Sequence, residues 1–254
     1  MKKIYPQLPP MNPPTPFRTH VDFEGARIPV FVAHPAMPPR VTVVMLGAIW
    51  SVTKHIEDLC VKLTAEGFGA VAPCLYRGEN IPARDAPPEV LRQTFLDFDD
   101  RRCVRDLRAV VRAAHDGRFG GEAGALVPWG FCLGGRFAHL LGALSEHVSG
   151  VVNFYGRQRF ARQPNKPFLP IELTGLIEVP YLGHFAEFDE LIPLGDVEEL
   201  KAALAARGVP HQVHVYKSAK HSFFDPTRPA DHDPSATAQA WSRTLDFLND
   251  LVRA

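Results

Sequence analysis

The sequence lacks an excess of charge of either sign and lacks any long apolar run. Its 254 residues contain 28 Lys and Arg against 28 Asp and Glu, a formal net charge of zero. Proteins that bind nucleic acid or anionic membranes usually carry a basic surplus, so neither partner is expected. No apolar stretch approaches the ~18 residues that a membrane-spanning helix needs. The 46% of hydrophobic residues instead indicates an ordinary globular protein with a substantial core.

Cysteine is scarce as well, and none of it forms a CxxC pair. The four cysteines are Cys60, Cys74, Cys103 and Cys132. The opening MKKIYPQLPP has two lysines, but prolines follow where a secretion signal would be apolar. We therefore expect free thiols in a cytoplasmic protein, and neither disulfides nor a zinc site. No phosphate-binding loop or dinucleotide fingerprint occurs, so no cofactor is expected.

Strand-like and helix-like segments alternate from residue 41 to the end. Short apolar runs rich in β-branched residues predict strands at 41–46, 69–76, 125–130, 150–156, 179–186 and 211–216. Apolar residues at helical spacing predict helices around 56–63, 107–114, 137–144, 195–207 and 241–248. This alternation predicts an α/β fold with a mostly parallel, twisted sheet and helices on both faces.

The ends of the alternating region bound the expected domain. Residues 1–17 are rich in proline and predict an extended arm, which leaves 18–254 as a single domain. Residues 21–35 read as two strands joined by a turn at Glu24-Gly25. The polar segment 77–98 is broken by proline and is not assigned, and 157–178 is expected to be a loop.

A nucleophile motif lies between the strand at 125–130 and the helix after it. Residues 130–134, GFCLG, have the form G-x-C-x-G, the cysteine version of a nucleophile elbow. A nucleophile on so tight a turn has a strained backbone, and the flanking glycines avoid clashes. The helix N-terminus favours a thiolate at Cys132 and leaves the N–H of Leu133 free to stabilise an oxyanion. A buried structural cysteine is the alternative interpretation of the motif alone.

An acid and a histidine follow in the chain order that acyl transfer on such a fold requires. Asp189 lies in the polar loop after the strand at 179–186, with Glu187 and Glu190 as rivals. His221 follows the strand at 211–216. Nucleophile, acid and base thus stand on the ends of strands, where open α/β sheets bind ligands.

The chain resembles the dienelactone hydrolase family of α/β-hydrolases from about residue 20 to the C-terminus. The similarity lies in GFCLGGRFA, EGFGAVAPCLY, FDELIP, AKHSF and RTLDFL. The resemblance implies Cys132 as nucleophile, His221 as base and Asp189 as the residue that orients the histidine. It also implies Ile49 as the second oxyanion donor beside Leu133. The implied activity is hydrolysis of a small ester or lactone through a thioester acyl-enzyme, without cofactor or metal.

Departures from the family pattern concern the substrate and the thiol. Family members carry a glutamate beside the oxyanion residue, where this chain has Ala48. They also hold the substrate carboxylate with an arginine soon after the catalytic histidine, but here 222–225 is SFFD and the next arginine is Arg228. A second family arginine could correspond to Arg84 or Arg92. Without the glutamate, we expect a more permanently ionised nucleophile than in the family.

These departures leave other functions open. A broader carboxylesterase or thioesterase is the alternative, and a non-catalytic scaffold that binds a ligand or partner is a third possibility. Trp50 and Phe223 are candidates for the pocket wall, although both also suit core packing. Arg157 follows the strand at 150–156 and could meet a substrate anion, while a solvated arginine is the commoner outcome.

Overall fold

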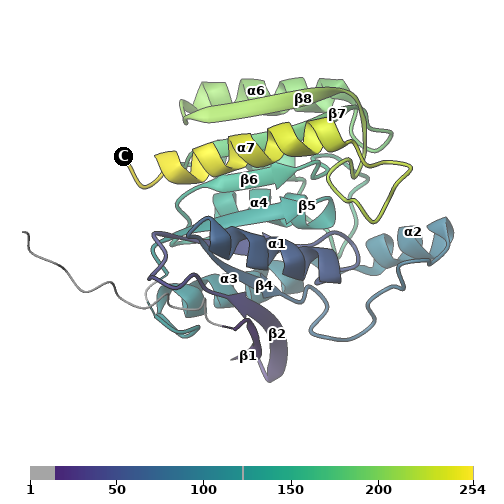
Figure 1. Cartoon of the computed structure of the whole chain (residues 1–254). Coiled ribbons are helices and arrows are strands. Elements are labelled where there is room, and N and C mark those ends of the chain that lie inside the picture. Colours follow the sequence, from purple (N-terminus) through teal and green to yellow (C-terminus); the bar gives the residue numbers. More distant parts are fainter. Residues whose placement is uncertain (1–14, 122, 254) are drawn as a thin grey trace, which may run out of the picture.

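A computed structural model of the protein describes residues 15–121 and 123–253 (Figure 1). One eight-stranded sheet runs through it in the order β1-β2-β4-β3-β5-β6-β7-β8. Its strands are β1 (Phe17–Phe23), β2 (Ala26–Ala33), β3 (Val41–Leu46), β4 (Gly69–Pro73), β5 (Ala125–Phe131), β6 (Val151–Phe154), β7 (Tyr181–Phe188) and β8 (His211–Lys220). β2 is antiparallel to β1 and β4, whereas β4, β3, β5, β6, β7 and β8 run parallel to one another. The predicted α/β fold with a mostly parallel sheet is confirmed.

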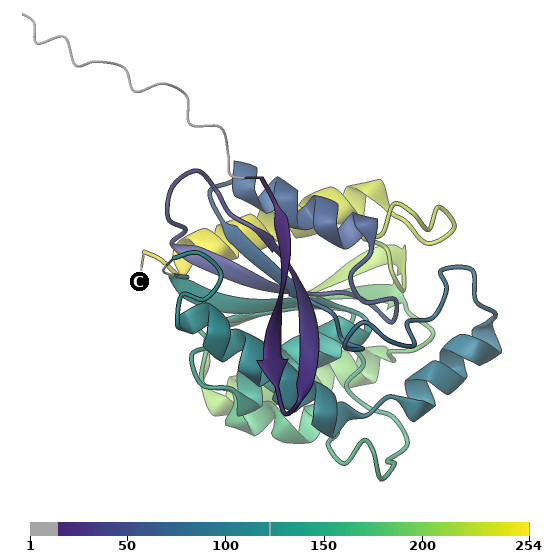
Figure 2. The same cartoon turned by 90° about the horizontal axis from the view of Figure 1, so that it is seen from below.

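Helices cover both faces of this sheet. They are α1 (Lys54–Ala65), α2 (Pro88–Asp97), α3 (Asp100–His115), α4 (Leu133–Leu144), α5 (Pro170–Leu173), α6 (Leu194–Arg207) and α7 (Pro234–Asp250), with a 3-10 turn, η1, at Thr174–Leu176. α1 and α7 lie on one face, and α3, α4 and α6 lie on the other (Figure 2). None of the helices in the described ranges is long and apolar enough to cross a bilayer.

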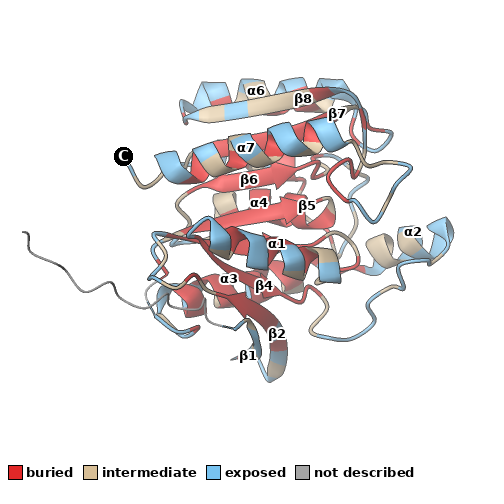
Figure 3. Ribbon diagram, in the orientation of Figure 1, coloured by how far each residue is buried: buried red, intermediate tan, exposed pale blue. Residues whose placement is uncertain are grey.

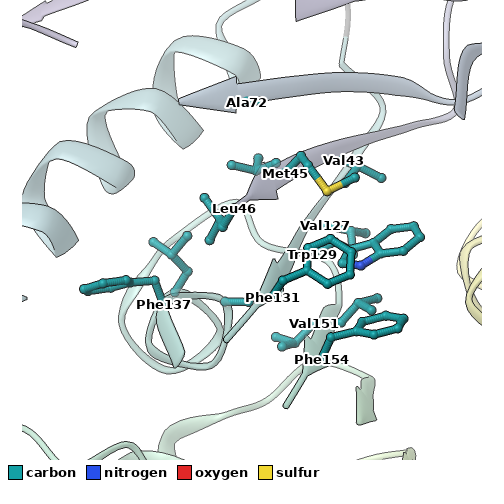
Figure 4. Packing of buried hydrophobic residues seen from close by; sticks show 14 of the residues in the cluster. Val43, Met45, Leu46, Ala72, Val127, Trp129, Phe131, Phe137, Val151 and Phe154 are labelled. Atoms are coloured by element: carbon teal, nitrogen blue, oxygen red, sulfur yellow. The ribbon is translucent and has the colours of Figure 1, made fainter. Parts of the chain in front are cut away.

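The central strands are buried on both faces, as Figure 3 shows. Every residue of β3 and β4 is buried, which explains why these strands read as continuous apolar runs in the sequence. The ring of Trp129 on β5 stacks on that of Phe154 on β6, with 5.6 Å between the ring centroids (Figure 4). The ring of Trp241 on α7 lies 5.8 Å from that of Trp129. Such close packing fixes the strands, and so fixes the loops that leave their ends.

Several boundaries differ from the sequence prediction. β4 ends at Pro73, and α2 forms inside the unassigned segment 77–98. No residue of α2 is buried, so the helix carries no core-facing apolar stripe that periodicity could detect. The predicted loop 157–178 contains α5 and η1. Of the predicted arm, 1–14 lies outside the described residues, and Phe17 already belongs to β1.

All four cysteines are free thiols, as expected. Cys60 and Cys103 are fully buried on the inner faces of α1 and α3, and Cys74 is buried just after β4. Cys132 differs from them because it is only partly buried. It is therefore the thiol that a ligand can reach.

Candidate active site

The turn between β5 and α4 holds Cys132 in a conformation that side chains rarely adopt. Its φ is 52° and its ψ is −110°, outside the usual regions for a residue other than glycine. A Cβ on Gly130 would lie 2.0 Å from the Gly134 carbonyl oxygen, and one on Gly134 would lie 2.1 Å from that of Leu46. The turn therefore requires both glycines, and the strain it stores at Cys132 is typical of functional positions.

We expect Gly134→Ala to destabilise the protein by at least about 3 kcal/mol, because the added carbon meets backbone that cannot move aside. Gly195→Ala is the matched control, since a Cβ there has no atom within 4 Å. That change should be neutral or stabilise α6 by up to about 1 kcal/mol. Urea unfolding measures both, and equal midpoints for the two variants would contradict the steric role of Gly134.

His221 and Asp189 form a hydrogen-bonded pair at the ends of β8 and β7. Nδ1 of His221 lies 2.7 Å from Oδ2 of Asp189, and the Asp189 side chain is 1% exposed. The other carboxylate oxygen, Oδ1, accepts from the N–H of Leu191 at 2.9 Å. Since an ionised carboxylate only accepts, Nδ1 donates to Asp189, and Nε2 is the ring nitrogen that can gain or lose a proton. Nε2 is buried and has no hydrogen-bond partner among the described residues.

Two backbone amides border the same space. Neither the N–H of Ile49 nor that of Leu133 donates to a backbone carbonyl among the described residues, and the Leu133 N–H acts on the thiol of Cys132, whose pKa it lowers. Tyr76 fixes the loop after β3, because its hydroxyl donates to the Ile49 carbonyl oxygen at 2.7 Å. The N–H of Leu133 is also the first amide of α4, where the helix dipole attracts negative charge.

A cavity of about 420 Å³ joins these groups. Cys132, His221 and both amide-bearing residues line it, and α2 closes one side (Pro88, Leu91, Arg92 and Phe95). The remaining wall comes from Trp50, Arg136, Arg157, Leu191, Ser222 and Arg228. The sequence did not reveal the contribution of α2, whose only signal was the i, i+4 spacing of Leu91 and Phe95.

The structure separates the two candidates for the pocket wall. Trp50 lines the cavity, and its indole N–H donates to the Ala83 carbonyl oxygen at 3.1 Å. Phe223 does not line it. Its ring is fully buried and packs against Tyr155 at 5.4 Å and Tyr216 at 5.0 Å. The expectation that Phe223 lines the pocket is therefore wrong, because the turn after β8 points that ring into the core and gives Ser222 to the cavity.

Electrostatics distinguish Cys132 from the other thiols. Burial alone would raise the pKa of Cys132, but the positive charge of His221 and the N–H of Leu133 lower it below the ordinary value. Burial alone would lower the pKa of His221, whereas the negative charge at Cys132 and the hydrogen bond to Asp189 raise it. Burial raises the pKa of Cys60 and Cys103. The site thus favours a thiolate beside an imidazolium.

Ala48 leaves space where a family glutamate would stand. It lines a second, small cavity of about 20 Å³ together with His55, Arg84 and Asp225. Arg84 donates to Asp225 at 3.1 Å, hydrogen-bonds Thr227, and stacks on Trp50 at 4.3 Å. Arg84 is therefore committed to holding its own loop and does not line the main cavity, unlike Arg92 and Arg228.

Within the described ranges, no cluster of three or more His, Cys, Asp or Glu side chains is arranged to hold a metal ion. The fully buried histidines have other roles. His139 hydrogen-bonds the Tyr181 hydroxyl and the Pro170 carbonyl oxygen, and burial lowers its pKa to about 4. It is a neutral core residue.

Comparison with known proteins gives one family. The model of the dienelactone hydrolase family matches residues 28–252. A protein of Escherichia coli O157:H7 named "Putative carboxymethylenebutenolidase" is 32% identical over 233 residues, which cover 91% of this chain and 85% of that protein. A Bradyrhizobium protein named "Probable 2-oxo-3-(5-oxofuran-2-ylidene)propanoate lactonase" is 28% identical over 220 residues, covering 86% and 87% of the two chains.

Solved structures agree with this result. A crystal structure of a Klebsiella pneumoniae protein titled "Putative Dienelactone Hydrolase" superposes with a TM-score of 0.84 at 29% identity. The superposition covers 91% of this chain and 97% of that one. The two proteins therefore share the fold over most of both chains.

Proposed function

Since the chain belongs to the dienelactone hydrolase family and is an ester or lactone hydrolase, we propose that it cleaves a small ester or lactone with Cys132 as nucleophile, His221 as acid and base, and Asp189 as the residue that orients the histidine. The amides of Ile49 and Leu133 form the oxyanion hole. The reaction passes through a thioester acyl-enzyme.

One observation carries this proposal. Asp189 fixes the His221 ring by a 2.7 Å hydrogen bond, while the buried Nε2 of that ring remains unpartnered on the cavity that Cys132 also lines. A buried polar atom without a partner is costly. The energetic cost of leaving Nε2 of His221 without a partner is explained if this atom exchanges a proton with the thiol and with the substrate oxygen.

Acylation begins with the thiolate of Cys132. The sulfur attacks the carbonyl carbon, and the carbonyl oxygen becomes an oxyanion that accepts from the N–H groups of Ile49 and Leu133. Each such donor is commonly worth about 3 kcal/mol in the transition state. The carbon–oxygen bond to the leaving group then breaks, and the departing alkoxide takes the proton from Nε2 of His221.

Deacylation reverses the role of His221. Nε2, now neutral, takes a proton from a water molecule, which attacks the thioester carbonyl. The tetrahedral intermediate collapses, the carboxylic acid leaves, and the Cys132 thiolate and His221 imidazolium are restored. For a lactone the leaving group stays attached to the acyl chain, so one hydroxy acid results.

The names of the relatives point to lactones as the substrate class, and we extend that class to this chain. A broader carboxylesterase or thioesterase is the second candidate. It is favoured by Ala48, which removes the family carboxylate beside the thiol, and by SFFD at 222–225, which lacks the family arginine. The two candidates share the mechanism and differ in what the cavity accepts.

The test is hydrolysis of p-nitrophenyl acetate and of a dienelactone, with mass spectrometry of the trapped enzyme and peptide mapping. We expect one acyl group on the peptide that contains Cys132, while the peptides with Cys60, Cys74 and Cys103 remain unmodified. Lactone turnover selects the lactonase, and ester turnover alone selects the broader esterase. Absence of both turnover and adduct would refute the proposal and favour a ligand-binding scaffold.

The thiolate has a pH signature. Because the pKa of Cys132 is lowered and that of His221 is raised, the ion pair should form below the ordinary pKa of a thiol. Thiolate absorbance in the ultraviolet, taken as the difference between wild type and Cys132→Ala, should fall as the pH drops through the lowered cysteine pKa. A midpoint at or above the ordinary value of about 8.5 would contradict this expectation.

A further inference from the structure

The guanidinium group of Arg136 is deeply buried and has few hydrogen-bond partners. Its side chain is 1% exposed, and its one hydrogen bond runs from Nη2 to Oδ1 of the fully buried Asp100 at 2.8 Å. The buried atoms Nε and Nη1 of Arg136 have no partner among the described residues, nor does Oδ2 of Asp100. Buried guanidinium groups normally have their donors satisfied, since an unpartnered charged donor is costly.

The surroundings of Arg136 hold its position without satisfying it. The rings of Phe95, Phe137 and Phe160 lie 5.0, 4.9 and 5.0 Å from the guanidinium carbon. Aromatic faces attract a cation but do not replace in-plane acceptors for its N–H groups. The buried Lys166 is close as well, and its amino group is bound to the backbone carbonyl oxygens of residues 96 and 98. Two buried cations therefore lie near the single buried carboxylate of Asp100.

Arg136 also borders the cavity that Cys132 lines. It follows Cys132 by four residues, in the first turn of α4, whose N-cap is Cys132. The long side chain of a helical residue points back toward the helix N-terminus, which is the end that carries Cys132. Both residues line the 420 Å³ cavity. Arg157 lines it too, and its buried Nε is likewise unpartnered.

We propose that Arg136, assisted by Arg157, binds an anionic group of the substrate, a carboxylate attached a few carbons from the carbonyl that Cys132 attacks. This proposal rests on the function proposed above and adds the residue that selects the substrate. A carboxylate supplies the in-plane acceptors that Nε and Nη1 lack. Asp100 holds the guanidinium in place from the opposite side through Nη2.

Two other roles for Arg136 lead to a different expectation: it could form a purely structural ion pair with Asp100, or it could stabilise the thiolate of Cys132. Either would affect all esters alike, because neither involves the distal end of the substrate. A residue that binds the substrate anion affects only substrates that carry the anion. The charge of the substrate therefore discriminates between these roles.

The experiment compares two esters in wild type and in the double variant Asp100→Asn/Arg136→Met. One is the p-nitrophenyl monoester of glutaric acid, and the other is its neutral isostere, in which an isopropyl group replaces the carboxylate. Removing both charges together avoids leaving a buried carboxylate alone. We expect kcat/KM for the glutarate ester to fall about 100-fold relative to the isostere, the scale of one lost charged hydrogen-bond partner. An equal fall for both esters would overturn the proposal.

The matched control removes another arginine–aspartate pair, which lies away from the cavity. Arg77 donates to the buried Asp106 through Nε at 2.8 Å and Nη2 at 2.6 Å. Asp106→Asn/Arg77→Met should lower stability without changing the ratio of the two rates. Circular dichroism and thermal unfolding of both double variants confirm that the compared proteins are folded.

A binding measurement separates this proposal from the proposed function. Calorimetry with glutarate is performed on Cys132→Ala, with and without the Asp100→Asn/Arg136→Met changes. If the Asp100→Asn/Arg136→Met changes abolish glutarate binding, the anion site is supported. This holds even if wild type hydrolyses neither ester, in which case the proposed hydrolysis fails and the anion site stands. Equal glutarate binding with and without Arg136 would overturn the anion site, whatever the hydrolytic activity.

Discussion

Replacing Cys132 by alanine should lower kcat/KM for ester hydrolysis by about 10⁶-fold, the scale seen when a nucleophile is removed from a comparable catalytic triad. The variant keeps the β5–α4 turn, because the alanine Cβ occupies the place of the cysteine Cβ. It loses the atom that forms the thioester, so the acyl adduct should vanish as well. Hydrolysis assays with the two p-nitrophenyl esters and intact mass spectrometry measure both effects.

Cys132→Ser is the matched control, since it keeps the shape of the side chain and replaces only the sulfur. It should fold like wild type and retain little activity, because a hydroxyl is not ionised by the His221 charge as a thiol is. The double variant Cys132→Ala/His221→Ala should be no slower than Cys132→Ala, since residues that act as one unit are not additive. Substantial turnover by Cys132→Ala would exclude this cysteine as the nucleophile.

Asp189→Asn should reduce kcat by about 10⁴-fold while leaving the fold intact. The amide keeps an oxygen that can accept from the Leu191 N–H, which Oδ1 of Asp189 does at 2.9 Å. Its NH₂ group, however, would face Nδ1 of His221 and would require that nitrogen to accept. The ring proton would then move to Nε2, and the histidine could no longer accept the proton of the thiol or of water. Steady-state kinetics and thermal unfolding measure the two consequences.

Glu187→Gln is the control for Asp189→Asn because Glu187 was the rival acid in the sequence. Its Oε2 accepts from the Ser218 N–H at 2.8 Å and makes no contact with the histidine. A glutamine oxygen preserves that bond, so activity should stay close to wild type. If Glu187→Gln lowered kcat as much as Asp189→Asn, the assignment of the acid would be wrong.

Local patterns in the sequence were enough to predict the architecture. The run at 41–46 and the alternation that follows it gave strands in the right places, because strands buried on both faces have no polar positions. The motif at 130–134 placed Cys132 between a strand and a helix, since two glycines are needed where the turn approaches other backbone so closely. Chain order then nominated Asp189 and His221 as the acid and base.

The sequence could not predict which side chains surround the cavity. α2 was missed because none of its residues is buried in the core, and its apolar residues Leu91 and Phe95 line the cavity instead. Phe223 was placed in the pocket, although a turn of only a few residues points its ring into the core. Side-chain direction after a strand end depends on the dihedral angles of the turn, which composition does not specify.

By itself, the sequence determined the fold class and the position of the G-x-C-x-G turn, because each depends on residues that are near one another in the chain. Only the tertiary structure decided that Arg136 is a buried cation with unpartnered donors and borders the cavity that Cys132 lines. In the sequence Arg136 is one of many arginines. Its environment comes from Asp100, Phe95 and Phe160, which are distant in the chain and meet only when the helices pack.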